Sequence, residues 1–388
     1  MTAIAQPRPV TGSPSERFTS RDPDAFEVPS SRDEDWRFTP LTSVRALFQP
    51  FVPTGALTGA VRATDVVTVA TVPMSDPRVG RALAPADRVS ALAFAHSDHA
   101  LVVAIPAGVE LERPVVVDAV AAPGLAYSHI VVDVGAQARA SVVIRYTGTA
   151  SIAENVELVV GDGAVLNVVA VHAFDRDAVH VSAHAAQIGR DATLRHTSVS
   201  LGGGVVRIAP TVHYAGPGGS ASLFGVGFAE DGQHFESRLF VDHSAPNCSS
   251  DVLYKNALQG DRARTVWIGD VRIRPSALGT ETFELNRNLL LSGGARADSV
   301  PNLEIETGDI AGAGHASATG RFDDLQLFYL QARGIPEPEA RRLVVRGFFA
   351  DVIERIGIPD LQDQLMSVIE ARLGATPEEQ DEVENDRA

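Results

Sequence analysis

Glycines recur at a nearly constant interval through the middle of this 388-residue chain. They stand at Gly108, Gly135, Gly161, Gly189 and Gly216, so that successive members are 27, 26, 28 and 27 residues apart. A repeat of this length predicts structural units that cannot bury their apolar faces alone and therefore stack on their neighbours. The segments between the glycines are short alternating apolar runs, such as HIVVDVG and NVELVVG, which is β-strand patterning. The interval therefore predicts a mainly β protein built as a β solenoid, or parallel β-helix.

Alanines reinforce this repeat. An alanine stands three residues after three of the glycines, at Ala138, Ala164 and Ala192, and Gly260 with Ala263 repeats the pattern after a longer insert. The alternative is a β-sandwich whose turns happen to be evenly spaced, although turns in sandwiches usually fall at irregular spacings. The regular interval favours the solenoid.

The texture of the sequence changes on both sides of the repeat. Residues 1–95 are predicted to be a mixed and partly helical region, in which SRDEDWRFTPLTSVRALF leads into a short helix. Residues 96–320 are predicted to form the β-helix core, and residues 321–375 a helical subdomain. Residues 376–388 are dominated by charge and are predicted to be a disordered acidic tail.

Three short helices are predicted after residue 320. Asp323 and Asp324 are capping acids for the first, which ends at Gly334, while Pro336 with Pro338 opens the second and Pro359 opens the third. Apolar residues recur at spacings of three and four in the second and third helices. The helices either form one another's core or leave an apolar face for a partner.

Composition restricts what the chain can do alone. Its formal net charge of −16 opposes binding to nucleic acid. No window approaches about 20 apolar residues without charge, and the first residues lack the apolar core of a signal peptide. We therefore expect a cytoplasmic protein that does not enter the membrane.

The counts of cysteine and lysine restrict its chemistry further. Cys248 is the one cysteine, so internal disulfides and all-cysteine metal sites within one chain are excluded. Lys255 is the one lysine, and no GxxxxGK[ST] loop occurs. Any nucleotide hydrolysis that serves this protein must therefore come from another chain.

A few side chains are candidate metal ligands. His315 stands in the small-residue segment DIAGAGHASATG, at the junction between the last β run and the first helix, where small neighbours leave room beside the ring. It is either a ligand near a second chain or a hydrogen-bonded loop histidine. His243 and Cys248 have a spacing that could present N and S ligands to one ion, but two ligands are too few, and a lone cysteine is commonly a small apolar core residue. Other histidines are expected to be surface or hydrogen-bonded side chains of the solenoid: His172, His180, His184, His196 and His213.

Three segments carry a resemblance to a known family. NLLLSGGARADSVPNLEIETGDIAGAGHASATGRFDDLQLFYLQARGI (288–335) resembles the SufB/SufD family of iron-sulfur assembly proteins, as do EDWRFTPL (34–41) and HFESRLFVDHSAPNCSSDVLYKNALQGDRAR (234–264). The form HASATGRFDD is most similar to SufD, because SufB members usually read His-Glu at this point. The resemblance implies a right-handed parallel β-helix that is a subunit of a SufBCD complex.

The resemblance also implies partners and residue roles. It implies a non-enzymatic subunit that pairs with a SufB-type subunit and docks a SufC-type ABC ATPase on its C-terminal helices. His315 matches a histidine at the SufB/SufD interface, where an iron-sulfur cluster is assembled transiently. Ala313 replaces a cysteine that some SufD proteins have two residues before this histidine. The expected ATPase-docking residues are Asp324, Gln326, Phe328, Tyr329, Arg333 and Gly334, and Cys248 with His243 is a secondary candidate site.

Two other functions are consistent with parts of the sequence. A SufB-like or homodimeric scaffold would hold the cluster by itself, although a single thiol argues against this role. A β-helix carbohydrate-active enzyme would need paired carboxylates along a groove, and no distinctive pair is evident. The chain itself is expected to bind no nucleotide, whereas flavin binding and homodimer formation in isolation stay open.

Overall fold

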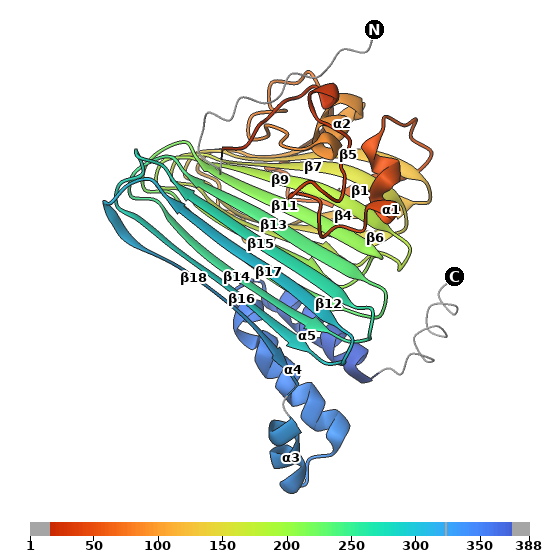
Figure 1. Cartoon of the computed structure of the whole chain (residues 1–388). Helices are drawn as coiled ribbons and strands as arrows, with labels where there is room; N and C mark the ends of the chain where they lie inside the picture. Colours follow the sequence, from red (N-terminus) through yellow and green to blue (C-terminus); the bar gives the residue numbers. More distant parts are fainter. Residues whose placement is uncertain (1–15, 323, 375–388) are drawn as a thin grey trace.

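The structure is a computed structural model that describes residues 16–322 and 324–374. It is mainly β, with 47% strand and 17% helix, and forms a parallel β-solenoid of about eight turns followed by helices (Figure 1). The fold class predicted from the glycine interval is confirmed.

Each coil of the solenoid contributes one strand to each of two sheets. Within the described residues both sheets have nine strands. Sheet A has the spatial order β1 (Ala56–Arg62), β4 (Val115–Ala122), β6 (Arg139–Gly148), β8 (Val165–His172), β10 (Thr193–Ser200), β12 (Ser220–Ala229), β14 (Ser249–Leu258), β16 (Thr280–Leu290) and β18 (Ile310–Arg321). Sheet B has the order β2 (Thr68–Pro73), β3 (His99–Ile105), β5 (Leu125–Val134), β7 (Ser151–Val160), β9 (Val179–Ile188), β11 (Val205–Tyr214), β13 (His234–His243), β15 (Arg264–Ile273) and β17 (Arg296–Ile305).

The strand pairing follows the repeat that was read from the glycines. Strands pair in parallel between successive coils, and Thr193, for example, faces Ser220 of the next coil, 27 residues later. The first strand of each sheet differs, because β1 pairs with β4 and β2 with β3 in antiparallel fashion. These two strands, which precede residue 96, close the N-terminal end of the solenoid.

The recurring glycines stack on one another at the turns. A Cβ atom added to Gly161 would lie 2.9 Å from the carbonyl carbon of Gly135, and one added to Gly189 would lie 3.0 Å from that of Gly161. No side chain fits in this column. The alanines that follow, such as Ala138 and Ala164, are fully buried. The interval is therefore the distance along the chain between turns that touch.

The space between the two sheets, here called the lumen, holds the main core. In the first coils its side chains are largely apolar, with Ile130, Val156 and Leu166 among them. In the later coils the rows that face the lumen become polar, as in Thr282, Glu284, Asn286 and Asn288 of β16, all of them buried. The polarity of the lumen therefore rises toward its C-terminal end.

The N-terminal region covers the outer face of sheet B. It comprises η1 (Pro23–Ala25), α1 (Leu41–Val44), η2 (Arg45–Phe48) and α2 (Arg88–His96). Trp36 and Phe48 pack with Val179 and Val181 of β9 in one apolar cluster. The buried Arg207 lies 4.0 Å from the centre of the Trp36 ring, which fixes this region to the sheet.

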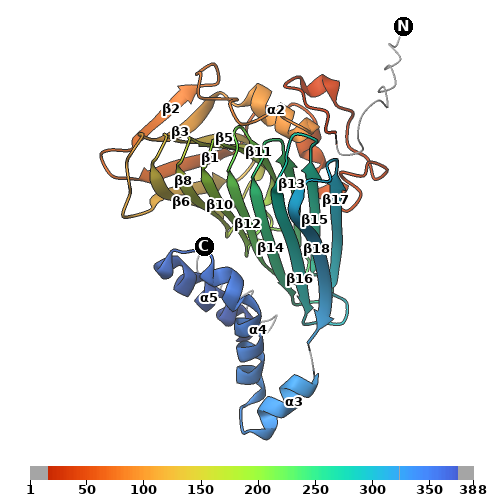
Figure 2. The ribbon, with the colours of Figure 1, turned by 90° about the vertical axis from the view of Figure 1, so that its left-hand side faces the viewer.

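The C-terminal helices cover the outer face of sheet A (Figure 2). The three predicted helices are present as α3 (Asp324–Ala332), α4 (Glu337–Glu354) and α5 (Pro359–Gly374). The apolar faces of α4 and α5 do not pack only on each other, because Phe349 and Leu365 share a cluster with Phe224 and Leu253 of sheet A. The expectation that the helices form only one another's core is therefore wrong: the outward residues of sheet A are apolar and need cover.

Polar contacts also hold α4 on the sheet. The Lys255 ammonium of β14 donates to the Phe348 carbonyl at 2.8 Å and to Asp351 Oδ1 at 2.6 Å. The Asn167 side chain donates to the Ile356 carbonyl at 2.8 Å. The predicted cap Asp323 and the predicted tail 376–388 lie outside the described residues. No helix in the described part of the chain is long and apolar enough to span a bilayer.

Candidate functional site

His315 lies in the middle of β18, the strand that ends sheet A within the described residues. We expected it in a loop, but the small residues around it continue the sheet, and α3 begins only at Asp324. Glu284 of β16 is its partner in the parallel register. Since β16 turns Glu284 toward the lumen, His315 belongs to the row of β18 that faces the same way. The imidazole is nevertheless exposed, because no strand follows β18 in the described part of the sheet.

A hydrogen-bonded asparagine network supports this end of the lumen. The Asn288 amide nitrogen donates to Asn286 Oδ1 at 2.8 Å and to Thr319 Oγ1 of β18 at 3.1 Å. Ser299 of β17 donates to Asn286 Oδ1 at 2.7 Å, which ties the two sheets together. The network fixes β18, and with it His315, against the preceding coil.

Glu284 is a buried carboxyl that the sequence did not reveal as a candidate. Its side chain is buried, with 3% exposure, and neither oxygen has a hydrogen-bond partner among the described residues. Burial raises the pKa of Glu284 to about 8, and the charge of Asp270 adds to this increase. The alternation in TETFELNRN, which puts a polar residue at every second position, was the signal that could have found it.

Cys248 and His243 are buried in structural settings. Cys248 lies before β14, with its Sγ atom 3.6 Å from the carbonyl oxygens of Gly216 and Pro246, and burial raises its pKa. His243 Nε2 lies 2.9 Å from Ser250 Oγ, and burial lowers the pKa of His243 to about 4. In the described ranges no group of three or more His, Cys, Asp and Glu residues could hold a metal ion. A secondary site at these two residues stays a prediction.

The other histidines depart from the expectation of surface or satisfied side chains. His172, His180, His184 and His196 are buried in the lumen, whereas His213 is exposed. His184 Nδ1 lies 2.9 Å from His196 Nε2, but neither nitrogen of His172 has a partner within the described residues. The alternation of β8, β9 and β10 turns these rings inward, where few polar groups can reach them.

Helix α3 presents an apolar surface away from the solenoid (Figure 1). Leu325, Phe328 and Tyr329 are 77%, 68% and 55% exposed, and the Arg333 guanidinium lies 4.5 Å from the centre of the Tyr329 ring. Gly334 has φ +85° and ends the helix as predicted. The side chains of Asp324 and Gln326 lie outside the described part of the structure.

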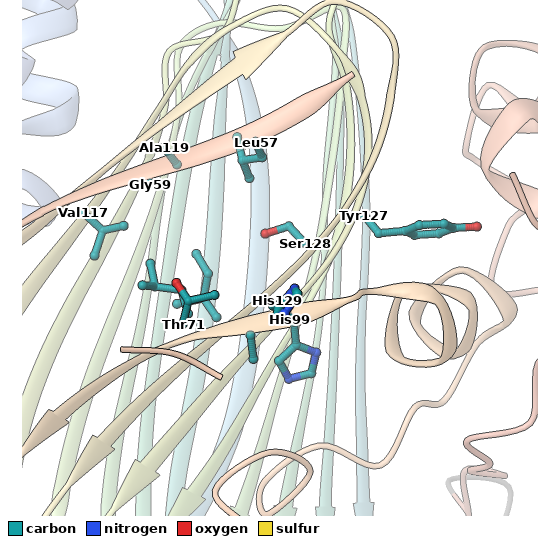
Figure 3. A pocket seen from close by; sticks show the side chains of 12 residues that line it. Leu57, Gly59, Thr71, His99, Val117, Ala119, Tyr127, Ser128 and His129 are labelled. Carbon is teal, nitrogen blue, oxygen red and sulfur yellow. The ribbon is translucent and has the colours of Figure 1, made fainter. Parts of the chain in front are cut away.

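A pocket of about 190 Å³ lies at the opposite end of the solenoid (Figure 3). Figure 3 shows Ser128 and His129 beside it, and both bind buried carboxylates: Ser128 donates to Glu154 Oε1 at 3.0 Å, and His129 Nε2 lies 2.8 Å from Glu157 Oε1. Glu157 also accepts backbone N–H groups from the loop at residues 80–83. These polar groups hold the first coils together, so His315 and its surroundings are the better candidate site.

Comparisons with known proteins give a consistent result. Residues 117–348 match the family described as "SUF system FeS cluster assembly, SufBD core domain". An iron-sulfur cluster assembly SufBD family protein of Mycobacterium bovis is 53% identical over 371 residues, which is 93% of each chain. The proteins named iron-sulfur cluster assembly protein SufD from Bacillus subtilis and Escherichia coli are 32% and 29% identical over 220 and 202 residues, covering 56% and 52% of this chain and 49% and 47% of theirs.

Proposed function

Because the chain belongs to the SufBD family of iron-sulfur cluster assembly proteins, we propose that it is a non-catalytic scaffold subunit of a SufBCD-type complex. In this proposal it pairs with a SufB-type subunit and docks a SufC-type ABC ATPase, and a cluster is assembled transiently at the interface in the cytoplasm. The observation that supports it most is the exposed His315 on the terminal strand of sheet A. An edge strand offers unpaired backbone groups to a second chain, and imidazole is a ligand for iron.

The ATPase is proposed to bind at α3. The exposed side chains of Phe328 and Tyr329 form an apolar surface on a helix that projects from the body of the protein. Aromatic residues of this kind carry much of the binding energy at protein interfaces. The one lysine is buried against α4, which fits a chain that leaves ATP hydrolysis to a partner.

A continuous set of contacts connects the two proposed sites. Helix α4 is bonded to β14 through Lys255, β14 pairs with β16, and β16 pairs with β18, which carries His315. Movement of the docked ATPase subunits on ATP binding would therefore act on the strands around His315. We propose that this movement opens or closes the interface where the cluster is assembled.

Replacing His315 with alanine should reduce cluster formation on the purified assembly by about tenfold or more, because one iron ligand is lost. Iron and acid-labile sulfide are measured after anaerobic reconstitution, together with the visible absorbance of the cluster. His99→Ala is the matched control, since His99 is also an exposed strand histidine but lies at the other end of the solenoid. An unchanged cluster content in H315A, with the complex intact on gel filtration, would contradict the proposed role.

The double substitution Phe328→Ala/Tyr329→Ala should weaken capture of the ATPase subunit by about 2 kcal/mol or more, because aromatic anchors are removed. Co-purification of the ATPase is quantified, with the SufB-type subunit expected to remain bound. Leu343→Ala/Val368→Ala serves as control, because these residues of α4 and α5 are also partly exposed apolar side chains, at 42% and 41%. Equal ATPase recovery with both double variants would show that α3 is not the docking element.

A further inference from the structure

The end of the lumen behind His315 contains a carboxyl group that lacks any partner. Glu284 is 3% exposed, and both of its oxygens are without a hydrogen bond in the described part of the structure. Leaving a carboxyl group in this state costs several kcal/mol. A buried group of this kind indicates that something absent from the isolated chain binds there.

Two hydrogen-bond donors beside Glu284 are also unsatisfied. The Tyr254 hydroxyl and the Trp267 Nε1 atom are buried and have no partner among the residues described. Their rings lie 6.3 Å apart. A Cβ atom added to Gly269 would come within 2.6 Å of both Glu284 Oε1 and the Trp267 ring. The carboxyl and the indole therefore meet above Gly269, and the absence of a side chain there keeps the space open.

The register connects this space to His315. Glu284 and His315 occupy the same position on adjacent strands, and neighbouring strands are about 4.8 Å apart. The row of residues that contains both side chains ends at β18 within the described residues. One ion at the end of the lumen could therefore be reached by the carboxylate from inside and by the imidazole from the edge.

The chemistry of the pair selects the class of ligand. A carboxylate and an imidazole together suit divalent first-row transition metals such as Fe²⁺, Mn²⁺, Co²⁺ and Zn²⁺, whereas a carboxylate would repel sulfide or another anion. Only two ligands come from this chain, in agreement with the finding that no three acidic, His or Cys groups converge in the described ranges. The remaining coordination positions are left to water, sulfide or the partner subunit.

We propose that Glu284 is a second metal ligand behind His315, so that the last coil holds one Fe²⁺ ion between a carboxylate and an imidazole. This inference rests on the proposed function, because it assigns the cluster iron a binding site on this chain. It gives the subunit a role in receiving iron, beyond lending one histidine to an interface.

Co²⁺ binding to the isolated full-length chain tests the proposal, since Co²⁺ has visible absorption bands that report its ligands. Wild type should bind one Co²⁺ per chain, and both Glu284→Gln and His315→Ala should weaken binding by about tenfold or more. Glu281→Gln is the matched control, because Glu281 lies three residues earlier on β16 and is exposed, and its variant should bind as wild type does. Glu284→Leu, which fills the lumen without an oxygen, repeats the test if the glutamine variant folds poorly.

Retention of wild-type Co²⁺ affinity and spectrum by the Glu284 variants would overturn the proposal, as would the absence of Co²⁺ binding by wild type. Thermal unfolding of each variant shows that it is folded. Cluster formation is measured on the assembly and Co²⁺ binding on the single chain, so the two failures are distinguishable. H315A that loses clusters beside E284Q that binds Co²⁺ normally would leave the proposed function standing and remove this inference.

Discussion

Substituting alanine for Gly225 should lower the free energy of unfolding by about 3 kcal/mol or more, one of the largest effects of adding a single methyl group to this chain. Gly225 lies on the lumenal row of β12, and its added Cβ would come 2.0 Å from Cδ1 and 2.3 Å from Cε1 of Tyr254. The Tyr254 ring is buried and packs near Trp267, so it cannot move aside without disturbing the core. Urea unfolding monitored by circular dichroism measures the loss.

Two other glycines provide controls for this effect. Nothing lies within 4 Å of a Cβ added at Gly293 or Gly308, and neither has positive φ. Their alanine variants should therefore unfold close to wild type. Combining Gly225→Ala with Tyr254→Leu should recover part of the loss if the clash is its cause. A Gly225→Ala protein as stable as the two controls would mean that the β12 and β14 side chains are not packed as described.

Acid should destabilise the fold strongly between about pH 6.5 and pH 4, because histidines in the lumen are buried in their neutral form. Burial lowers the pKa of His196 to about 4 and that of His184 well below its usual value of 6.5. The unfolded chain thus takes up protons first as the pH falls, so this stability is fully present above pH 6.5 and is lost toward pH 4. At pH 5 the two residues together account for a loss on the order of 4 kcal/mol.

The double variant His184→Leu/His196→Leu isolates this contribution. It removes both partners of the His184–His196 hydrogen bond, so no ring is left behind unpaired by the change itself. Urea unfolding of both proteins at pH 7.5 and pH 5.0 gives the comparison. Glu284, whose pKa is raised to about 8, gains stability on acidification through this range, but it does so equally in both proteins. The same dependence of stability on pH in wild type and variant would refute the explanation.

The sequence predicted the solenoid because its turns obey a local rule. Gly135, Gly161 and Gly189 must lack side chains, since each turn rests on the one before it. The interval then lengthens: Ser249 of β14 pairs with Glu281 of β16, 32 residues later. Longer turns interrupt the pattern there, which explains why the repeat fades before the end of the solenoid.

The N-terminal region was less predictable because distant partners hold it. Thr39 donates to Glu236, 197 residues away, and Arg17 pairs with Asp270 at 2.5 Å, 253 residues away. Neither pairing has a signature in the local sequence. The site divides in the same way: His315 stands in a distinctive motif, whereas Glu284 becomes its neighbour only through the register of β16 and β18.

Lys255 has a practical consequence for mapping the neighbours of this protein. Its amine is the only one carried by a side chain in the sequence, and it is enclosed by Phe348 and Asp351. Cross-linkers and labels that react with amines should therefore leave the described surface unmarked, however closely other proteins approach it. Reagents that activate carboxylates, which abound on this acidic chain, suit such experiments better.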